Sequence, residues 1–212
     1  MTDLSADPPP RSAHAPAGPP AAQVSRGRQA QPNGWWGMTL FLCSEAVVFG
    51  TMMSSYFYLN FGARHWPPDG IKAPGVTAPA LATAALIATA PLLALAVRAA
   101  RAGRRWPTVR WIGVAVVIQC AYLGVQVVLF RDDLMHFTPQ GSAYGSIYFT
   151  LLAAHHAHVL LGILLGLAVM WKLSTAGLDN YWLIGTRGLA LYWYVVSGLA
   201  VLVLLTVLSP SL

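Results

Sequence analysis

Glu45 is the only glutamate among the 212 residues, and it lies in the middle of an apolar segment. No other residue between positions 34 and 61 is charged. At about 1.5 Å of rise per residue, a helix that begins near Gly34 places Glu45 about 16 Å along its axis, near the centre of a hydrocarbon layer about 30 Å thick. A carboxyl group at that depth costs free energy unless it faces protein, water or a lipid headgroup. Glu45 is therefore the first candidate for a functional residue.

The composition fixes the class of protein. Hydrophobic residues make up 56% of the chain, charged residues only 9%, and the mean hydropathy is +0.56. A soluble domain carries about 25% charged residues, so this chain lacks the polar surface of a soluble protein. Each of five apolar windows reaches about the 20 residues that a spanning helix needs: 34–61, 76–97, 111–130, 144–171 and 189–208. We predict an all-α bundle of five transmembrane helices.

The basic residues predict the orientation of the bundle, because short cytoplasmic loops are enriched in Lys and Arg. The segment 97–111 holds five arginines, the densest positive cluster in the chain. When this loop is placed in the cytoplasm, ten basic residues lie inside and three lie outside. The N-terminus is then cytoplasmic and the C-terminus is outside. Basic loops near anionic headgroups account for the net charge of +6 without any nucleic-acid partner.

The first 33 residues differ from the rest of the chain. They contain seven prolines together with Ala, Ser, Gly and Gln, and they show no hydrophobic periodicity. Such a composition cannot bury a core, so we predict a disordered cytoplasmic tail over residues 1–33 and a transmembrane domain over residues 34–212.

A cluster of histidines marks the fourth predicted helix, where the sequence reads LLAAHHAHVLLGILLG. His155 and His158 are three residues apart and share a helix face, which Gly162 and Gly166 continue. The two glycines form a GxxxG step, a pattern that lets another helix approach closely. The histidines either form hydrogen bonds to an acidic partner such as Glu45, or only satisfy each other and backbone carbonyls as packing contacts.

A haem or metal site is disfavoured. Bis-histidine ligation draws its ligands from facing helices, but all three intramembrane histidines lie on one helix. The chain has no CxxC pair and no carboxylate–histidine spacing that suits a closed metal site. We predict no metal, no haem and no catalytic residue in this chain.

Four motifs in order resemble subunit III of the haem–copper respiratory oxidases, in its short five-helix form. Residues 41–49 read FLCSEAVVF and match the family pattern F-L-x-S-E-x-x-x-F, with Glu45 at its membrane-buried glutamate. Residues 66–68, WPP, match a tryptophan–proline loop. His155 and His158 begin the pattern H-x-x-H-V-x-x-G, and residues 192–193, YW, match the start of the last-helix motif. The resemblance covers residues 35 to about 208.

Several positions depart from the family pattern. In the last helix the family has a histidine and an aspartate where this chain has Tyr194 and Ser197. In the third helix a glutamate usually follows three residues after the glutamine, but Leu129 follows Gln126 here. His156 also replaces a glycine. What the missing ionisable groups do in other members is not transferred to this chain, and a divergent branch, such as an accessory subunit of a quinol oxidase or nitric oxide reductase, is the alternative.

The resemblance implies a supporting role in aerobic electron transport. Subunit III of this family carries no haem or copper, packs against catalytic subunit I in a complex that also holds subunit II, and binds phospholipids. The complex reduces oxygen and pumps protons, and the implied location is a prokaryotic plasma membrane. Glu45, His155 and His158 are then expected to line the buried polar part of the bundle.

One further hypothesis concerns two arginines, and two others concern rival classes of function. Arg104 and Arg105 are expected to anchor the topology, and a lipid-headgroup site at these residues is the alternative. A stand-alone proton or solute transporter, with Glu45 and the His155–His158 face as a relay, is the main rival to the oxidase-subunit hypothesis. A membrane cytochrome is disfavoured by the placement of the histidines on one helix.

Overall fold

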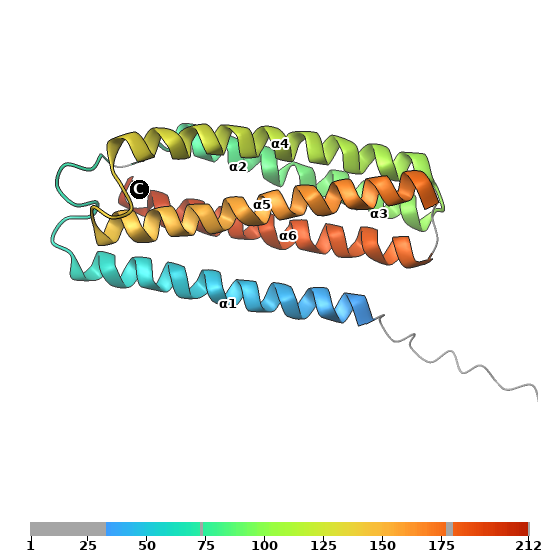
Figure 1. Cartoon of the computed structure of the whole chain (residues 1–212), viewed down its shortest axis with the longest axis horizontal. Helices are drawn as coiled ribbons and strands as arrows, with labels where there is room; N and C mark the ends of the chain where they lie inside the picture. Colours follow the sequence, from blue (N-terminus) through green and yellow to red (C-terminus); the bar gives the residue numbers. More distant parts are fainter. Residues whose placement is uncertain (1–32, 73, 177–179, 212) are drawn as a thin grey trace, which may run out of the picture. The chain divides into compact units, whose positions relative to one another are not determined.

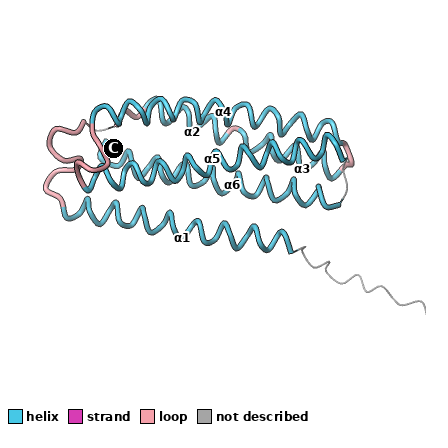
Figure 2. The backbone as a smooth tube through the Cα atoms, viewed as in Figure 1, coloured by secondary structure: helices cyan, strands magenta, loops and turns pink. Residues whose placement is uncertain are grey.

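The computed structural model describes residues 33–72, 74–176 and 180–211. This part of the chain is helical, and it contains no strand (Figures 1 and 2). In chain order the helices are α1 (Asn33–Gly62), α2 (Thr77–Ile87), α3 (Thr89–Arg101), α4 (Arg105–His136), α5 (Ala143–Ala176), α6 (Asn180–Leu208) and the short 3₁₀ helix η1 (Ser209–Ser211). The predicted tail lies outside the described residues except for Asn33, which begins α1, and it stays a prediction.

The predicted all-α fold with five spans is confirmed. Within the described residues, five helical stretches are long and apolar enough to cross a membrane, with α2 and α3 together forming one of them. The helices run beyond the apolar windows of the sequence. α4, for example, extends from Arg105 past Asp132 and Asp133, because a helix continues beyond the hydrocarbon layer while an apolar window ends at the first charges. The orientation of the termini remains a prediction.

The second span is interrupted at Ala88, between α2 and α3. Pro91 has no backbone N–H, so the carbonyl of Ile87 four residues earlier has no helical donor there. The hydroxyl of Thr89, which is completely buried, donates to the carbonyl of Leu86 at 2.7 Å. The side chain therefore supplies a hydrogen bond beside the point where the backbone ladder is broken.

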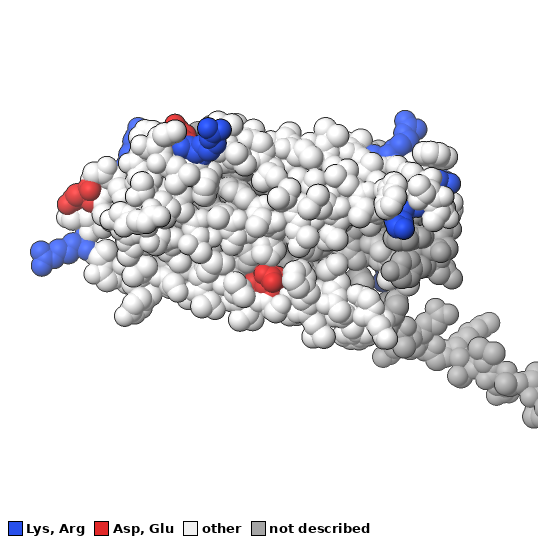
Figure 3. All heavy atoms as spheres, viewed as in Figure 1, with Lys and Arg blue, Asp and Glu red and all other residues white. Residues whose placement is uncertain are grey.

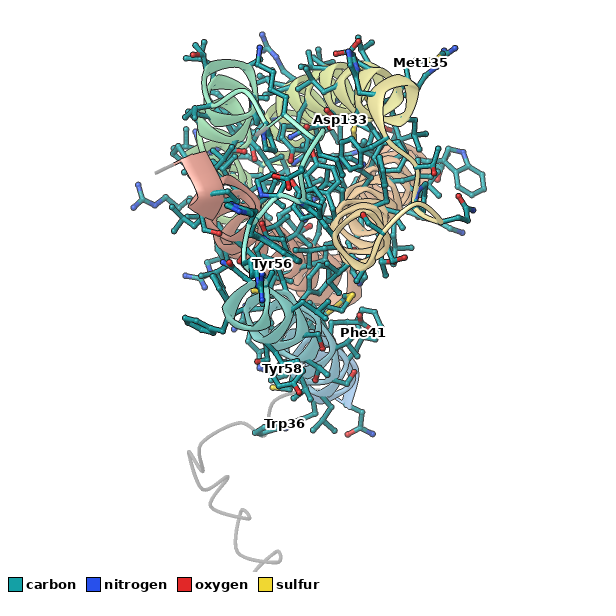
Figure 4. The ribbon with its side chains drawn as sticks, turned by 90° about the vertical axis from the view of Figure 1, so that its left-hand side faces the viewer. Trp36, Phe41, Tyr56, Tyr58, Asp133 and Met135 are labelled. Atoms are coloured by element: carbon teal, nitrogen blue, oxygen red, sulfur yellow. The ribbon has the colours of Figure 1, made fainter. Side chains whose placement is uncertain are left out.

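Helix α6 lies in the centre of the bundle, and α1 lies at its edge. α6 contacts α1, α2, α3 and α5, whereas α1 contacts only α5 and α6 among the described elements. In the apolar stretch of α1 11% of the residues are buried, against 56% in α6. Figure 4 shows Tyr56 directed from α1 towards the other helices and Tyr58, Phe41 and Trp36 lying on its outer side. Most of α1 is thus free to face lipid or another chain.

Charged side chains gather at the two ends of the bundle. Figure 3 shows Lys or Arg side chains at both ends, acidic side chains at one end only, and a single acidic patch on an otherwise uncharged face between the ends. This distribution matches a bundle whose middle lies in hydrocarbon and whose ends reach the headgroups. The two ends are called here the Arg104 end, where α3 meets α4, and the Asp133 end, where α4 meets α5.

Candidate functional site

Glu45 on α1 and His158 on α5 form the central polar contact between these two helices. Oε2 of Glu45 lies 2.9 Å from Nε2 of His158. The edge of the Phe49 ring packs against the imidazole, with the ring centroids 5.2 Å apart. Glu45 and His158, separated by 113 residues in the sequence, therefore share one site.

The other contacts of His158 determine how many protons the Glu45–His158 pair carries. Nδ1 of His158 lies 2.7 Å from the carbonyl oxygen of Ala154. A carbonyl only accepts hydrogen bonds, so Nδ1 must carry a proton and donate it. The contact between Nε2 and Glu45 then contains one further proton, carried either by the carboxyl group or by the imidazole. The pair is electrically neutral overall in both cases, which is the low-cost state for ionisable groups in a membrane.

The pair is not sealed from its surroundings. The side chain of His158 is 17% exposed and that of Glu45 is 21% exposed. On the other side of the backbone, the Tyr192 hydroxyl of α6 donates to the carbonyl of His158 at 2.7 Å. The site therefore joins α1, α5 and α6 and leaves Glu45 reachable from the outside of the bundle.

His155 belongs to a different polar cluster, between α5 and α4. It is only 3% exposed, and its Nε2 lies 3.1 Å from the hydroxyl of Tyr122. The amide of Gln126 donates to the same hydroxyl at 3.0 Å. The direction of the contact between Tyr122 and His155 is set by which ring nitrogen of His155, Nδ1 or Nε2, carries the proton. Nδ1 of His155 has no hydrogen-bond partner among the described protein atoms.

The remaining predicted site residues contact different neighbours. A methyl group on Gly162 would lie 2.6 Å from the indole of Trp193, and one on Gly166 would lie 2.8 Å from the side chain of Val116. The two glycines thus make room for side chains of α6 and α4 respectively. At the Arg104 end, Arg105 donates to the carbonyl of Ser174 on α5, whereas Arg104 is exposed.

One of the two alternatives from the sequence was an acidic partner such as Glu45 for the histidines, and in the structure Glu45 contacts His158. The sequence did not identify the partners of His155. Tyr122 and Gln126 follow Gln119 on one buried face of α4, at spacings of three and four residues. Polar residues at that period within an otherwise apolar helix were the available signal. Near the Asp133 end, a further pair also lacked a sequence signal: the hydroxyl of Tyr148 donates to Oδ2 of Asp133 at 2.6 Å.

The described residues include no group of three or more His, Cys, Asp or Glu side chains placed to hold a metal ion. The polar side chains of the candidate site are instead hydrogen-bonded to one another and to backbone carbonyl groups. Chemically, the arrangement holds one proton between Glu45 and His158 and a separate hydrogen-bonded chain from Gln126 through Tyr122 to His155.

The chain is similar to several proteins that are named subunit 3 of a terminal oxidase. Subunit 3 of the cytochrome bo(3) ubiquinol oxidase of Pseudomonas aeruginosa is 29% identical over 149 residues, which are 69% of this chain and 70% of the relative. Cytochrome c oxidase subunit 3 of Thermostichus vulcanus is 26% identical over 68% of this chain and 70% of the relative. A probable quinol oxidase subunit 3 of Staphylococcus haemolyticus is 26% identical over 74% of this chain and 78% of the relative.

The family model described as cytochrome c oxidase subunit III matches residues 25–209, which include all five spans and both polar clusters. This match agrees with the order of the motifs around Glu45, His155 and His158. The chain belongs to the cytochrome c oxidase subunit III family.

Proposed function

We propose that this chain is the non-redox subunit III of a proton-pumping haem–copper terminal oxidase in a prokaryotic plasma membrane. It supports the catalytic subunit during oxygen reduction in aerobic electron transport. The observation that carries the proposal is the family match over residues 25–209. In this assignment haem and copper reside in partner subunits I and II, and this chain contributes helices, the half-buried Glu45–His158 pair and contacts to phospholipid.

Two features of the geometry favour a role in stabilising the complex. α1 is bound to the bundle along one side and leaves large apolar side chains such as Leu40 and Val47 exposed, so it has surface available for a partner subunit or for lipid. The neutral Glu45–His158 pair holds α1 onto α5 near the middle of both helices. A subunit whose main task is to stabilise a larger assembly needs such internal ties more than it needs a reactive centre.

The relatives differ in the electron donor that their names give. Their names include a ubiquinol oxidase and a cytochrome c oxidase, at 29% and 26% identity respectively. These identities do not separate a quinol branch from a cytochrome c branch, because the groups that recognise a donor belong to other subunits. A reduced-minus-oxidised spectrum of the purified complex reports the haem type and narrows the branch.

The test is affinity purification of the chain, tagged at its N-terminus, from native membranes in a mild detergent. We expect haem absorbance and a large catalytic subunit to copurify, and an untagged chain purified in parallel is the control. Deletion of the gene should lower oxygen turnover per catalytic subunit, and the tagged chain should restore it. A colourless chain that is stable alone and that transports protons or solutes in vesicles would overturn the proposal in favour of the transporter.

A further inference from the structure

A cavity of about 50 Å³ lies between α2, α4, α5 and α6, on the side of α5 away from Glu45. We call it the polar chamber. Its polar lining consists of Thr83, Tyr122, Gln126, Asp133, Tyr148, His155 and His156. The apolar part of the lining includes Leu129 and Leu152. We propose that the polar chamber is a binding site for a small cluster of water molecules within the membrane-spanning bundle.

The size of the chamber selects the ligand. A bound water needs roughly 10–15 Å³ of such volume, so the chamber holds about three to five. A lipid tail or a quinone ring is far larger. The lining carries hydroxyl, amide, carboxyl and imidazole groups, and these polar groups suit water better than an apolar occupant.

The strongest single indication is His155. Its side chain is 97% buried, since only 3% is exposed, and its Nε2 is already bonded to Tyr122. Its other ring nitrogen, Nδ1, has no hydrogen-bond partner among the described protein atoms. A buried ring nitrogen is normally hydrogen-bonded to a protein group or to an ordered water, and none of the described protein groups fills that role here.

The chamber also has a source of water. Asp133 and Pro74 line both the chamber and a larger depression of about 360 Å³ at the Asp133 end, which Lys72, Asp132 and His136 also line. Figure 4 shows Asp133 on the inner side of α4, whereas Met135 lies on its outer side. The chamber therefore ends at a carboxylate that also borders a polar surface, and the Tyr148–Asp133 hydrogen bond lies at this boundary.

Hydroxyl-radical footprinting of the purified native assembly tests the proposal without any substitution. X-rays generate radicals from bound water, and mass spectrometry then identifies the side chains that those radicals modify. Tyr122 and Tyr192 form a matched pair, because both are 4% exposed or less and both hydroxyls are hydrogen-bonded. Only Tyr122 lines the chamber. We expect Tyr122 to be modified at least several-fold faster than Tyr192, and equal protection of the two would overturn the proposal.

Filling the chamber provides a second test. Leu129→Phe adds an aromatic ring at the chamber wall, so modification of Tyr122 should fall to the level of Tyr192. The control is Val128→Phe, on the neighbouring residue that is 67% exposed on the outer face of α4, and it should leave Tyr122 reactive. Leu152→Phe fills the chamber from α5 and serves where Leu129→Phe prevents folding. If Tyr122 is modified as fast as before in a folded variant whose chamber is filled, the radicals that reach it do not come from water in the chamber. That result would refute the proposed water site.

Discussion

Glu45 and His158 meet near the middle of their helices with 2.9 Å between Oε2 and Nε2, and they share a single proton. Nδ1 of His158 already donates to the carbonyl of Ala154, so the imidazole presents Nε2 to α1 in a fixed orientation. The pair is therefore a directional link between α1 and the rest of the bundle. Its strength depends on a hydrogen bond and does not require a net charge.

The first prediction follows from this distinction. Glu45→Gln keeps a donor for Nε2 of His158, and we expect assembly and thermal stability close to those of the natural chain. Glu45→Leu removes the donor and should destabilise the contact between α1 and α5 by about 1–2 kcal/mol, as interhelical hydrogen bonds in membranes do. The measurement is the amount of assembled complex together with its thermal unfolding midpoint. Equal losses in both variants would mean that an ionised carboxylate is required.

The second prediction concerns the close approach of α6 to α5 at Gly162. A methyl group there would lie 2.6 Å from a ring carbon of the Trp193 indole, which is itself buried. We expect Gly162→Ala to cost about 1–3 kcal/mol, because overpacking forces rigid groups apart. Gly198→Ala is the control, since a methyl group at that position of α6 meets no atom within 4 Å.

A compensating change makes this prediction specific. Trp193→Phe removes part of the indole that a methyl group on Gly162 would meet, while the contact with the Tyr192 ring at 2.8 Å stays. The double variant should therefore lose less stability than the sum of the two single changes. Thermal unfolding of the four proteins forms a double-mutant cycle, which isolates the interaction energy of the two positions. Simple additivity of the two single effects would exclude the clash as the cause.

The sequence predicted the five spans because an apolar run of about 20 residues without charge has few other folds available. It also suggested Glu45 as a partner for the histidines, since a lone carboxyl in a membrane needs a hydrogen bond. It did not predict that His155 pairs with Tyr122, because this contact depends on the rotation of α4 relative to α5. Relative rotation is set by packing of whole helix faces, and one sequence contains no direct record of it.

The break in the second span is another feature that the apolar pattern of the sequence did not predict. Pro91 in the sequence indicates where helical hydrogen bonding fails, but the continuous apolar window from 76 to 97 gave no reason to divide the span. The orientation of the termini still rests on the positive-inside rule alone.

The third prediction tests the hydrogen bond beside this break. Thr89→Val keeps the shape of the side chain but removes the hydroxyl that donates to the carbonyl of Leu86 at 2.7 Å. Because Thr89 is completely buried, we expect a loss of about 1 kcal/mol in the free energy of unfolding. Thr150→Val removes a bond of the same type to Ser146, but Thr150 is exposed, and the change should stay within about 0.5 kcal/mol. Equal effects of the two substitutions would contradict a special role for the bond at the break.

The fourth prediction separates two adjacent arginines at the Arg104 end. Arg105 donates to the carbonyl of Ser174 and thereby ties the start of α4 to the end of α5, whereas Arg104 is exposed. Arg105→Gln should therefore lower the thermal stability, by roughly 1 kcal/mol for a lost charge-assisted hydrogen bond at a partly exposed site. Arg104→Gln should leave stability unchanged and reduce the anionic phospholipid retained by the purified protein, measured by native mass spectrometry, if the headgroup interpretation holds. Retention of the same lipid by both variants and by the natural chain would instead assign Arg104 to membrane orientation alone.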